Sequence, residues 1–175
     1  MNLNVEKILI IGLGLIGSSI AATAKSKGIK VTGFDLNEDT LKKAIDEKII
    51  DTTIDAIETI NSTDVDLIIL AVPPKKTLEL FKSLNYLWNT KTTITDTASV
   101  KNHIKLDDVN NIVLSHPIAG SHKSGTLAAD KDLFFNKKNV ICNPFKASED
   151  HLNRLINYWE DALHMNTSIM SVNDH

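Results

Sequence analysis

The chain has 175 residues, of which 42% are hydrophobic, and this is enough to bury the core of one domain. Its formal net charge is −3, from 19 basic and 22 acidic residues, and no basic run is longer than a Lys-Lys pair. This balance argues against a nucleic-acid or membrane partner and favours a small-molecule ligand.

The compartment is indicated by cysteine usage and by the apolar runs. The single cysteine, Cys142, cannot form an intramolecular disulfide, which is typical of a reducing compartment. The first residues lack the apolar core and cleavage site of a signal peptide, and no apolar run is long enough for a spanning helix. We therefore expect a cytoplasmic protein, and the sequence indicates no metal site.

Short apolar runs alternate along the chain with segments of helical spacing. The apolar runs predict strands at residues 7–11, 30–34, 66–72, 92–95, 111–114, 139–142 and 167–170. Helical spacing predicts helices at residues 15–26, 37–47 and 75–86, and a further helix that begins at Ser148. Because several strands lack polar alternation, helices should cover both faces of a parallel sheet. The predicted fold class is therefore α/β, with a doubly wound, mostly parallel sheet.

The last predicted helix places its large apolar residues on one side. These residues are Leu152, Leu155, Ile156, Trp159 and Leu163. We interpret Trp159 as a core residue, and His151 and His164, which fall outside this stripe, as surface residues.

A glycine-rich turn follows the first predicted strand. Gly12, Gly14 and Gly17 have the spacing G-x-G-x-x-G, which allows a tight turn, a close approach to a pyrophosphate and close packing of helix on strand. The free N–H groups at the helix N-terminus would bind the anion. This pattern predicts a Rossmann-type dinucleotide-binding domain whose cofactor-binding residues include Gly12, Leu13, Gly14, Leu15, Ile16 and Gly17.

An acidic residue ends the second predicted strand. Asp35 lies 18 residues beyond Gly17, near the roughly 20 residues at which an acid meets a ribose 2′-hydroxyl. An acid there repels a 2′-phosphate, and no arginine follows it in the segment DLNEDT. NAD is therefore favoured over NADP as the cofactor. The alternative is an ordinary strand, turn and helix in which Asp35 only caps the helix.

Three further strands lead into residues that suit a ligand site: Pro73 and Pro74 after the third, Ser99 and Lys101 after the fourth, and His116 after the fifth. Ala71 and Val72, which end the third strand, are cofactor-binding candidates together with Pro73. In an open parallel sheet the ligand lies outside the carboxyl ends of the strands, so these loops should face one site. Two structural alternatives stay open. Thr97 or Ser99 could cap a short helix that runs to about Leu106, and His116 could be a structural histidine.

Five motifs in this order, GLGLIGSS, AVPP, TDTASVK, SHPIAGSHKSG and LFFNKKNVICNP, resemble those of the prephenate and arogenate (cyclohexadienyl) dehydrogenase family. The resemblance covers nearly the whole chain and corresponds to that family's N-terminal cofactor domain. It implies an NAD-dependent oxidative decarboxylation in tyrosine biosynthesis, in which a ring carbon loses hydride and the ring becomes aromatic as carbon dioxide leaves. It also implies that Ser99 and His116 are catalytic, and that the substrate-binding residues are Ser99, His116, Gly120, Ser121 and His122.

The chain departs from the family pattern in two respects. His122 stands where the family usually has an acid, which leaves prephenate and arogenate both open as substrates, and a solvent-exposed loop histidine is the alternative. The family also has a helical C-terminal domain that dimerises and supplies basic residues to the substrate. His175 falls where a His-Asp pair opens that domain. We therefore expect an NAD-binding domain at residues 1–170, a connection that starts at 171–175, and a homodimer formed through the further domain.

Two other functional classes stay open at this point. One is a related nicotinamide-dependent enzyme of the hydroxyacid dehydrogenase or imine reductase type, against which Ser99 and His116 in their motifs argue. The other is a non-catalytic NAD-binding module, which could keep every glycine and Asp35 without performing any chemistry.

Overall fold

Five parallel strands form the sheet that carries the glycine-rich turn. The computed structural model describes residues 5–122 and 124–175. The strand order is β3-β2-β1-β4-β5, which is the order of the first five strands of a Rossmann-type sheet. The strands are β1 (Lys7–Ile11), β2 (Lys30–Phe34), β3 (Thr52–Thr53), β4 (Leu67–Leu70) and β5 (Thr93–Asp96). The predicted α/β class is confirmed, and among the strands of this sheet only the two-residue β3 was absent from the prediction.

Helices bury both faces of this sheet. Along β1, Ile8 and Ile10 belong to one apolar cluster, which also contains residues of α1 (Leu15–Ser26). Leu9 and Ile11 belong to a second cluster, with Phe81 of α3 (Pro74–Ser83). Strands without polar alternation are expected when both faces are covered, and this arrangement confirms that interpretation.

The helix starts follow local sequence signals. The side chain of Asn37 accepts a hydrogen bond from Thr40 N at 3.2 Å and so caps α2 (Glu38–Asp46). Pro74 lies in the first turn of α3, where a missing N–H costs nothing. These turns hold the loops at the carboxyl edge of the sheet in fixed positions.

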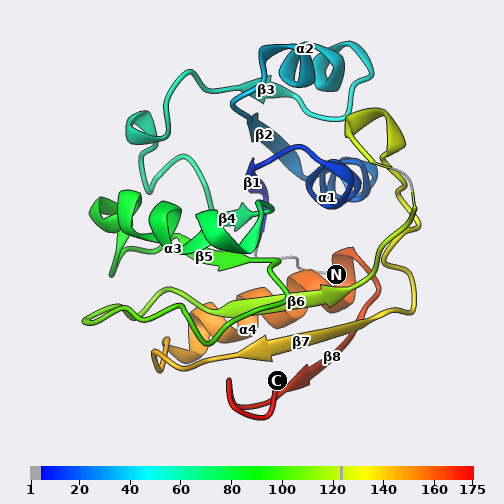
Figure 1. Cartoon of the computed structure of the whole chain (residues 1–175). Helices are drawn as coiled ribbons and strands as arrows, with labels where there is room; N and C mark the ends of the chain where they lie inside the picture. The colour runs from blue at the N-terminus through cyan, green and yellow to red at the C-terminus, as the bar shows by residue number, and fades with distance from the viewer. Residues whose placement is uncertain (1–4, 123) are drawn as a thin grey trace.

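A second sheet lies beside the first (Figure 1). Its strand order is β6-β7-β8, from β6 (Leu114–Ile118), β7 (Lys138–Cys142) and β8 (Asn166–Ile169). β6 runs antiparallel to β7, whereas β8 is parallel to it. Among the described residues, one isolated parallel bridge joins Ile94 of β5 to Ile112, which lies just before β6.

The prediction of a strand at residues 111–114 was wrong in its position. Ser115 and His116 lie inside β6 and not in a loop after it, because pairing with β7 extends the strand through these polar residues. Pro117 is tolerated because β6 is an edge strand of its sheet. His116 therefore reaches the site from a strand of the second sheet.

Helix α4 (Glu149–Asn157) and the π-helical turn η4 (Tyr158–Ala162) complete the core. Trp159 is fully buried, as predicted. The prediction that His151 is a surface residue was wrong: it is 7% exposed, because α4 packs against β5 and its Nδ1 lies 2.8 Å from Thr93 Oγ1. His164 is half-buried and contacts Lys27 Nζ at 2.8 Å. Over the described part of the chain, no helix has the length and apolar character to cross a membrane.

Candidate functional site

The turn between β1 and α1 has space for glycine only at two of its three positions. Gly12 has φ +96°, and a Cβ there would lie 2.5 Å from the carbonyl oxygen of Ala71 at the end of β4. A Cβ on Gly17 would lie 1.9 Å from the carbonyl oxygen of Gly12. Both glycines are therefore required by the protein's own packing, as predicted for a tight turn followed by a closely packed helix.

Gly14 differs, because a Cβ at this position would meet nothing within 4 Å. It is exposed and is the N-cap residue of α1, which has no side-chain cap and no acid in its first turn. The first N–H groups of this helix thus have no intrahelical partner. Such a helix start fits a bound pyrophosphate, and the open space at Gly14 fits a ligand that approaches the backbone.

Asp35 follows β2 and holds the glycine-rich turn in place. Its Oδ2 accepts a hydrogen bond from Leu13 N at 2.8 Å, and its Oδ1 accepts one from Asn37 N at 3.0 Å. A carboxylate has about four lone-pair sites, so both oxygens can accept further hydrogen bonds from ribose hydroxyls. The residue therefore fits the predicted role towards NAD and also holds the turn, but it does not cap the helix as its alternative supposed, because Asn37 caps α2.

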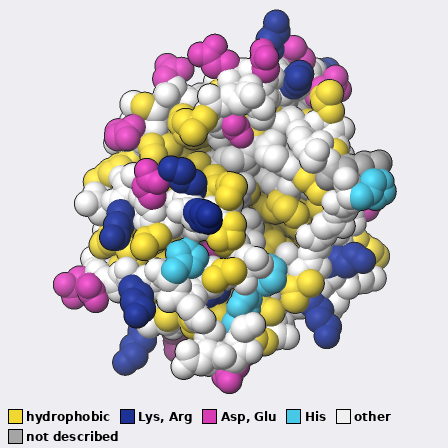
Figure 2. Space-filling view, in the orientation of Figure 1, with side chains coloured by type: hydrophobic (Ala, Val, Ile, Leu, Met, Phe, Trp, Pro, Cys, Tyr) yellow, Lys and Arg dark blue, Asp and Glu magenta, His cyan; other side chains and the backbone are white. Residues whose placement is uncertain are grey.

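The predicted residues at the end of β4 lie beside this turn. The Ala71 carbonyl limits the space at Gly12, and a Cβ at Gly12 would also lie 3.0 Å from Val72 Cγ1. Ala71 and Val72 are half-buried, and Pro73 is exposed. The carboxyl ends of β1, β2 and β4 thus form one edge. Figure 2 shows a hollow on this face with hydrophobic side chains in it and histidines along its lower side.

Ser99 lies exposed in the loop that follows β5. The alternative that Thr97 or Ser99 caps a helix running to Leu106 was wrong, because residues 97–106 contain a bend and a turn but no helix. The loop takes its shape instead from Lys101, which turns inward and is 2% exposed. Its Nζ lies 2.6 Å from Oδ2 of Asp96, a residue with no exposed surface.

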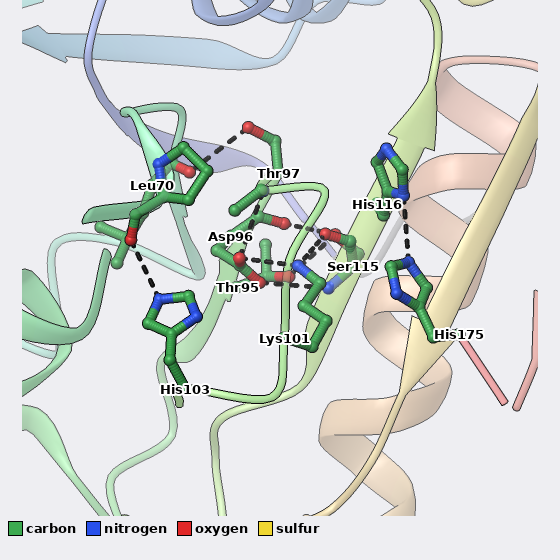
Figure 3. A network of polar contacts seen from close by, with 11 residues as sticks. Leu70, Thr95, Asp96, Thr97, Lys101, His103, Ser115, His116 and His175 are labelled. Atoms are coloured by element: carbon green, nitrogen blue, oxygen red, sulfur yellow. Dashed lines mark hydrogen bonds and ion pairs between the residues drawn. The ribbon is translucent and has the colours of Figure 1, made fainter. Parts of the chain in front are cut away.

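The Asp96–Lys101 ion pair holds Ser115 of β6 (Figure 3). Lys101 Nζ donates to the Ser115 carbonyl oxygen at 2.6 Å, and Asp96 Oδ1 accepts from Ser115 N at 3.3 Å. The hydroxyl of Ser115 donates to the Asp96 carbonyl oxygen at 2.7 Å. We call these three residues the clamp. Because Asp96 ends a strand of the first sheet, the clamp brings β6 to the carboxyl edge of that sheet.

The charges of the clamp are buried together. Burial raises the pKa of the Asp96 carboxyl, while Lys101 and two backbone N–H groups act to lower it. Burial likewise lowers the pKa of the Lys101 ammonium, and the charge of Asp96 opposes that shift. The hydrogen bonds on both partners stabilise the charged pair.

His116 follows the clamp on β6 and contacts the histidine at residue 175. Its Nδ1 lies 3.0 Å from His175 Nε2, and the two rings meet edge to face with centroids 5.1 Å apart. Figure 3 shows the other ring nitrogen of His116 turned away from His175. Burial, His175 and the charge of Lys101 all lower the pKa of His116. The imidazole is therefore neutral at neutral pH and can accept a proton.

The loop after β6 runs from the clamp to the glycine-rich turn. It carries Gly120, Ser121 and His122, which are exposed. Further on, Thr126 Oγ1 donates to the Leu13 carbonyl oxygen at 2.6 Å. A pocket of about 470 Å³ lies between this loop and the start of α1, and its lining includes both Leu15 and Ser121. The structure thus brings one predicted cofactor residue, Leu15, and one predicted substrate residue, Ser121, to the same pocket, whose lining does not include His116.

Three residues of the site were not singled out from the sequence: Asp96, Thr126 and His103. His175 was noted only at the expected domain junction and not as a partner of His116. Asp96 belongs to the TDTASVK motif, and the signal available in the sequence was an acid at the end of an apolar strand, five residues before a lysine. His103 contacts the Pro74 carbonyl oxygen at 3.0 Å, at the start of α3. The contacts of Thr126 and His175 join segments more than fifty residues apart, so no local pattern indicates them. In residues 5–122 and 124–175 no three His, Cys, Asp or Glu side chains form a group that could hold a metal ion.

Comparison with known sequences gives consistent matches. Residues 20–164 match the family model for the prephenate dehydrogenase nucleotide-binding domain. The chain is 40% identical over 147 residues to prephenate dehydrogenase from Lactococcus lactis subsp. cremoris, covering 78% of this chain and 40% of the relative. It is 30% identical over 167 residues to prephenate dehydrogenase from Bacillus subtilis, covering 90% of this chain and 44% of the relative. The chain thus spans less than half the length of these two relatives.

Comparison with solved structures agrees. Prephenate dehydrogenase from Aquifex aeolicus, solved in complex with hydroxyphenyl propionate and NAD+, superimposes with a TM-score of 0.89 at 29% identity. That match covers 100% of this chain and 63% of the other. Synechocystis arogenate dehydrogenase shares the fold, with a TM-score of 0.84 at 24% identity over 97% of this chain and 61% of the other.

Proposed function

Because the chain belongs to the prephenate dehydrogenase family, we propose that it is the NAD-binding part of an enzyme that oxidatively decarboxylates prephenate or arogenate in tyrosine biosynthesis. One observation carries this proposal: the clamp brings His116 to the carboxyl edge of the parallel sheet. That edge is where a dinucleotide lies in this type of fold. A neutral imidazole beside a nicotinamide site suits the oxidation of a hydroxyl group.

The cofactor residues act through backbone geometry. The N–H groups at the start of α1 would bind the pyrophosphate of NAD, and Asp35 would accept hydrogen bonds from the ribose hydroxyls. Ala71, Val72 and Pro73 would line the same crevice. NAD, when bound, supplies the hydride acceptor of the reaction.

The catalytic residues act on the substrate hydroxyl. His116 would accept the hydroxyl proton on Nε2, because its Nδ1 is held by His175. Ser99, exposed on the loop after β5, would hydrogen-bond the same hydroxyl and fix its position. Oxidation at this carbon then allows the ring carboxylate to leave as carbon dioxide.

The loop after β6 would form the substrate side of the site. Gly120, Ser121 and His122 are exposed there, and Ser121 reaches the pocket at the start of α1. His122 would place an imidazole where the family usually has an acid. Prephenate carries a keto group and arogenate an amino group at this end of the molecule, so turnover of both substrates must be compared.

Domain division and oligomeric state stay predictions. We propose that residues 1–170 form the NAD-binding domain, of which residues 1–4 lie outside the described part. Residues 171–175 would begin a connection to a dimer-forming domain. His175 supports a role for this connection at the site, because it already contacts His116.

The proposal is tested by binding and turnover together. Isothermal titration calorimetry of the purified protein should show NAD binding tighter than NADP binding, because Asp35 repels a 2′-phosphate. NADH formation should then depend on added prephenate or arogenate, measured in the longest form of the protein that can be expressed. Tighter NADP binding would contradict the cofactor assignment, and NAD binding without turnover of either substrate would indicate a non-catalytic module.

A further inference from the structure

Lys101 is a buried cation that the proposed proton transfer does not use. It is 2% exposed, and Asp96, its partner, has no exposed surface. Removing two charges from water is costly, and apolar residues of similar size often stabilise a fold as well as a buried ion pair does. Stability alone therefore does not explain why this pair lies beneath the site.

The contacts of Lys101 lead to the backbone of β6. Its ammonium bonds both Asp96 and the carbonyl oxygen of Ser115, each at 2.6 Å. The Asp96 carboxylate accepts a hydrogen bond from the backbone N–H of the same serine, and the Asp96 carbonyl oxygen accepts one from its hydroxyl. Ser115 thus has its backbone N–H, its carbonyl and its side chain all held by two residues, Asp96 at the end of β5 and Lys101 in the loop that follows.

These contacts stand where backbone hydrogen bonds between β5 and β6 would otherwise connect the two strands. Over the described residues, β5 and β6 are not paired as strands, and the bridge between Ile94 and Ile112 lies short of the site. The position of β6 relative to the nucleotide-binding sheet is therefore set by side chains where the ladder is missing. His116 is the next residue along β6, so the position of Ser115 also fixes the position of His116.

We propose that Lys101 is a positioning residue for His116: it fixes the backbone of β6 through Ser115, and it places a buried positive charge next to the imidazole. The inference rests on the proposed role of His116 as a proton acceptor. Positioning by Lys101 would keep His116 both in place and in its neutral, proton-accepting form.

The charges around His116 support this role. The Lys101 charge acts with burial and with His175 to lower the pKa of His116. The same charge lowers the pKa of His175, which Asp96 acts to raise. From β7, the thiol of Cys142 also lies within electrostatic range of Lys101. Among these groups Lys101 is the one that disfavours the imidazolium while also holding the backbone.

The test follows the titration of His116 by NMR in the purified 175-residue protein. Replacing Lys101 by Met keeps the chain length and removes the charge, so the titration midpoint of His116 should move to higher pH. Lys101→Arg restores a charge and should return the midpoint towards that of the wild type. Lys76→Met, which removes an exposed lysine paired only with Glu79, should leave it unchanged.

Another histidine reports in the same spectra whether the whole fold has loosened. His151 is buried beside β5, and burial lowers its pKa. Its midpoint should stay constant in Lys101→Met while that of His116 moves. If the His151 midpoint also rises, the effect is a general loss of structure, and the proposal is wrong.

Lys101→Met leaves the buried Asp96 carboxylate without its partner charge, which is strongly destabilising. The double variant Asp96→Asn/Lys101→Met removes both charges, and it should fold and still raise the His116 midpoint. An unchanged midpoint in either folded variant would overturn the proposal. Because this measurement needs no substrate, failure of the proposed enzyme function would appear separately, as absent turnover by the wild type.

Discussion

The glycine-rich turn and the clamp are built in opposite ways. The turn uses consecutive residues, and its shape depends on backbone that cannot accept a Cβ at Gly12 or Gly17. The clamp joins Asp96 of β5 and Lys101 of the following loop to Ser115 of β6, in the other sheet, mainly through the two charged side chains. A phosphate can be bound by helix N–H groups alone, whereas a proton acceptor needs a side chain held at a fixed distance. Cofactor binding and chemistry should therefore fail separately when each region is altered.

The largest expected separation comes from His116→Asn. The amide keeps polarity and approximate size but cannot accept the proton, so kcat should fall by about 10²–10⁴-fold, the usual contribution of general acid–base catalysis. Affinity for NAD should stay the same, because the phosphates are held elsewhere. Steady-state kinetics and calorimetric titration of the same preparation measure both quantities. Near-normal kcat would return His116 to a structural role.

The pH dependence of the wild type tests the same residue. Only the neutral imidazole accepts a proton, so kcat should be lost as pH falls through the pKa of His116. Burial, His175 and Lys101 lower that pKa, so the loss should occur below pH 6.5, the ordinary value for histidine. Cofactor affinity over the same range should be nearly constant. An acidic limit above the ordinary histidine value would contradict the assignment.

A matched pair of glycine substitutions separates packing from ligand contact. In Gly17→Ala the new Cβ overlaps the Gly12 carbonyl oxygen, so we expect a loss of about 1–3 kcal/mol in the free energy of unfolding, as for an overpacked core. In Gly14→Ala the Cβ meets no protein atom, so stability should be unchanged while NAD affinity falls. Urea unfolding and NAD titration of both variants provide the measurement. Unchanged NAD binding in Gly14→Ala would mean that the pyrophosphate lies elsewhere.

Asp35→Ser tests cofactor choice. Removing the carboxylate should reduce the preference for NAD over NADP by about tenfold, equivalent to roughly 1.4 kcal/mol, because the repulsion of a 2′-phosphate is lost. Absolute affinity for both cofactors should also fall somewhat, since Leu13 N loses its acceptor. The ratio of the two dissociation constants is therefore the informative measurement. An unaltered ratio would leave Asp35 with its structural role alone.

The two regions also differ in how far the sequence predicted them. Gly12, Gly14, Gly17 and Asp35 are close in sequence, and their spacing follows directly from strand and helix geometry. The position of His116 was predicted from a short apolar run, and the strand boundary was wrong because pairing with β7 cannot be seen locally. Lys101 was noted within its motif, but its burial depends on Asp96 and Ser115, which meet only when two sheets pack. His151 was misjudged for the same reason, since α4 packs against β5.

Thr126 provides the smallest test, because it connects the two regions. Its hydroxyl donates to the Leu13 carbonyl oxygen in the glycine-rich turn, and its loop carries Ser121 and His122 from β6. Thr126→Val keeps the shape and removes this hydrogen bond, so the free energy of unfolding should fall by about 0.5–1.5 kcal/mol. The Leu13 carbonyl keeps its bond from Ser18 Oγ, which limits the cost.

The matched control for this substitution is Thr90→Val, which removes a similar hydrogen bond to the Leu87 carbonyl oxygen on a different loop. Each variant loses one hydroxyl-to-carbonyl bond, and Thr90→Val also removes the acceptor of a long hydrogen bond from Thr92 N at 3.4 Å, so its loss of stability in urea unfolding should be equal or slightly larger. Only Thr126→Val should also weaken NAD binding, because Leu13 lies in the turn that would receive the pyrophosphate. If the two variants bind NAD equally well, the loop after β6 stabilises the fold without shaping the cofactor site. Coupling between the substrate loop and the cofactor turn would then depend on contacts other than Thr126.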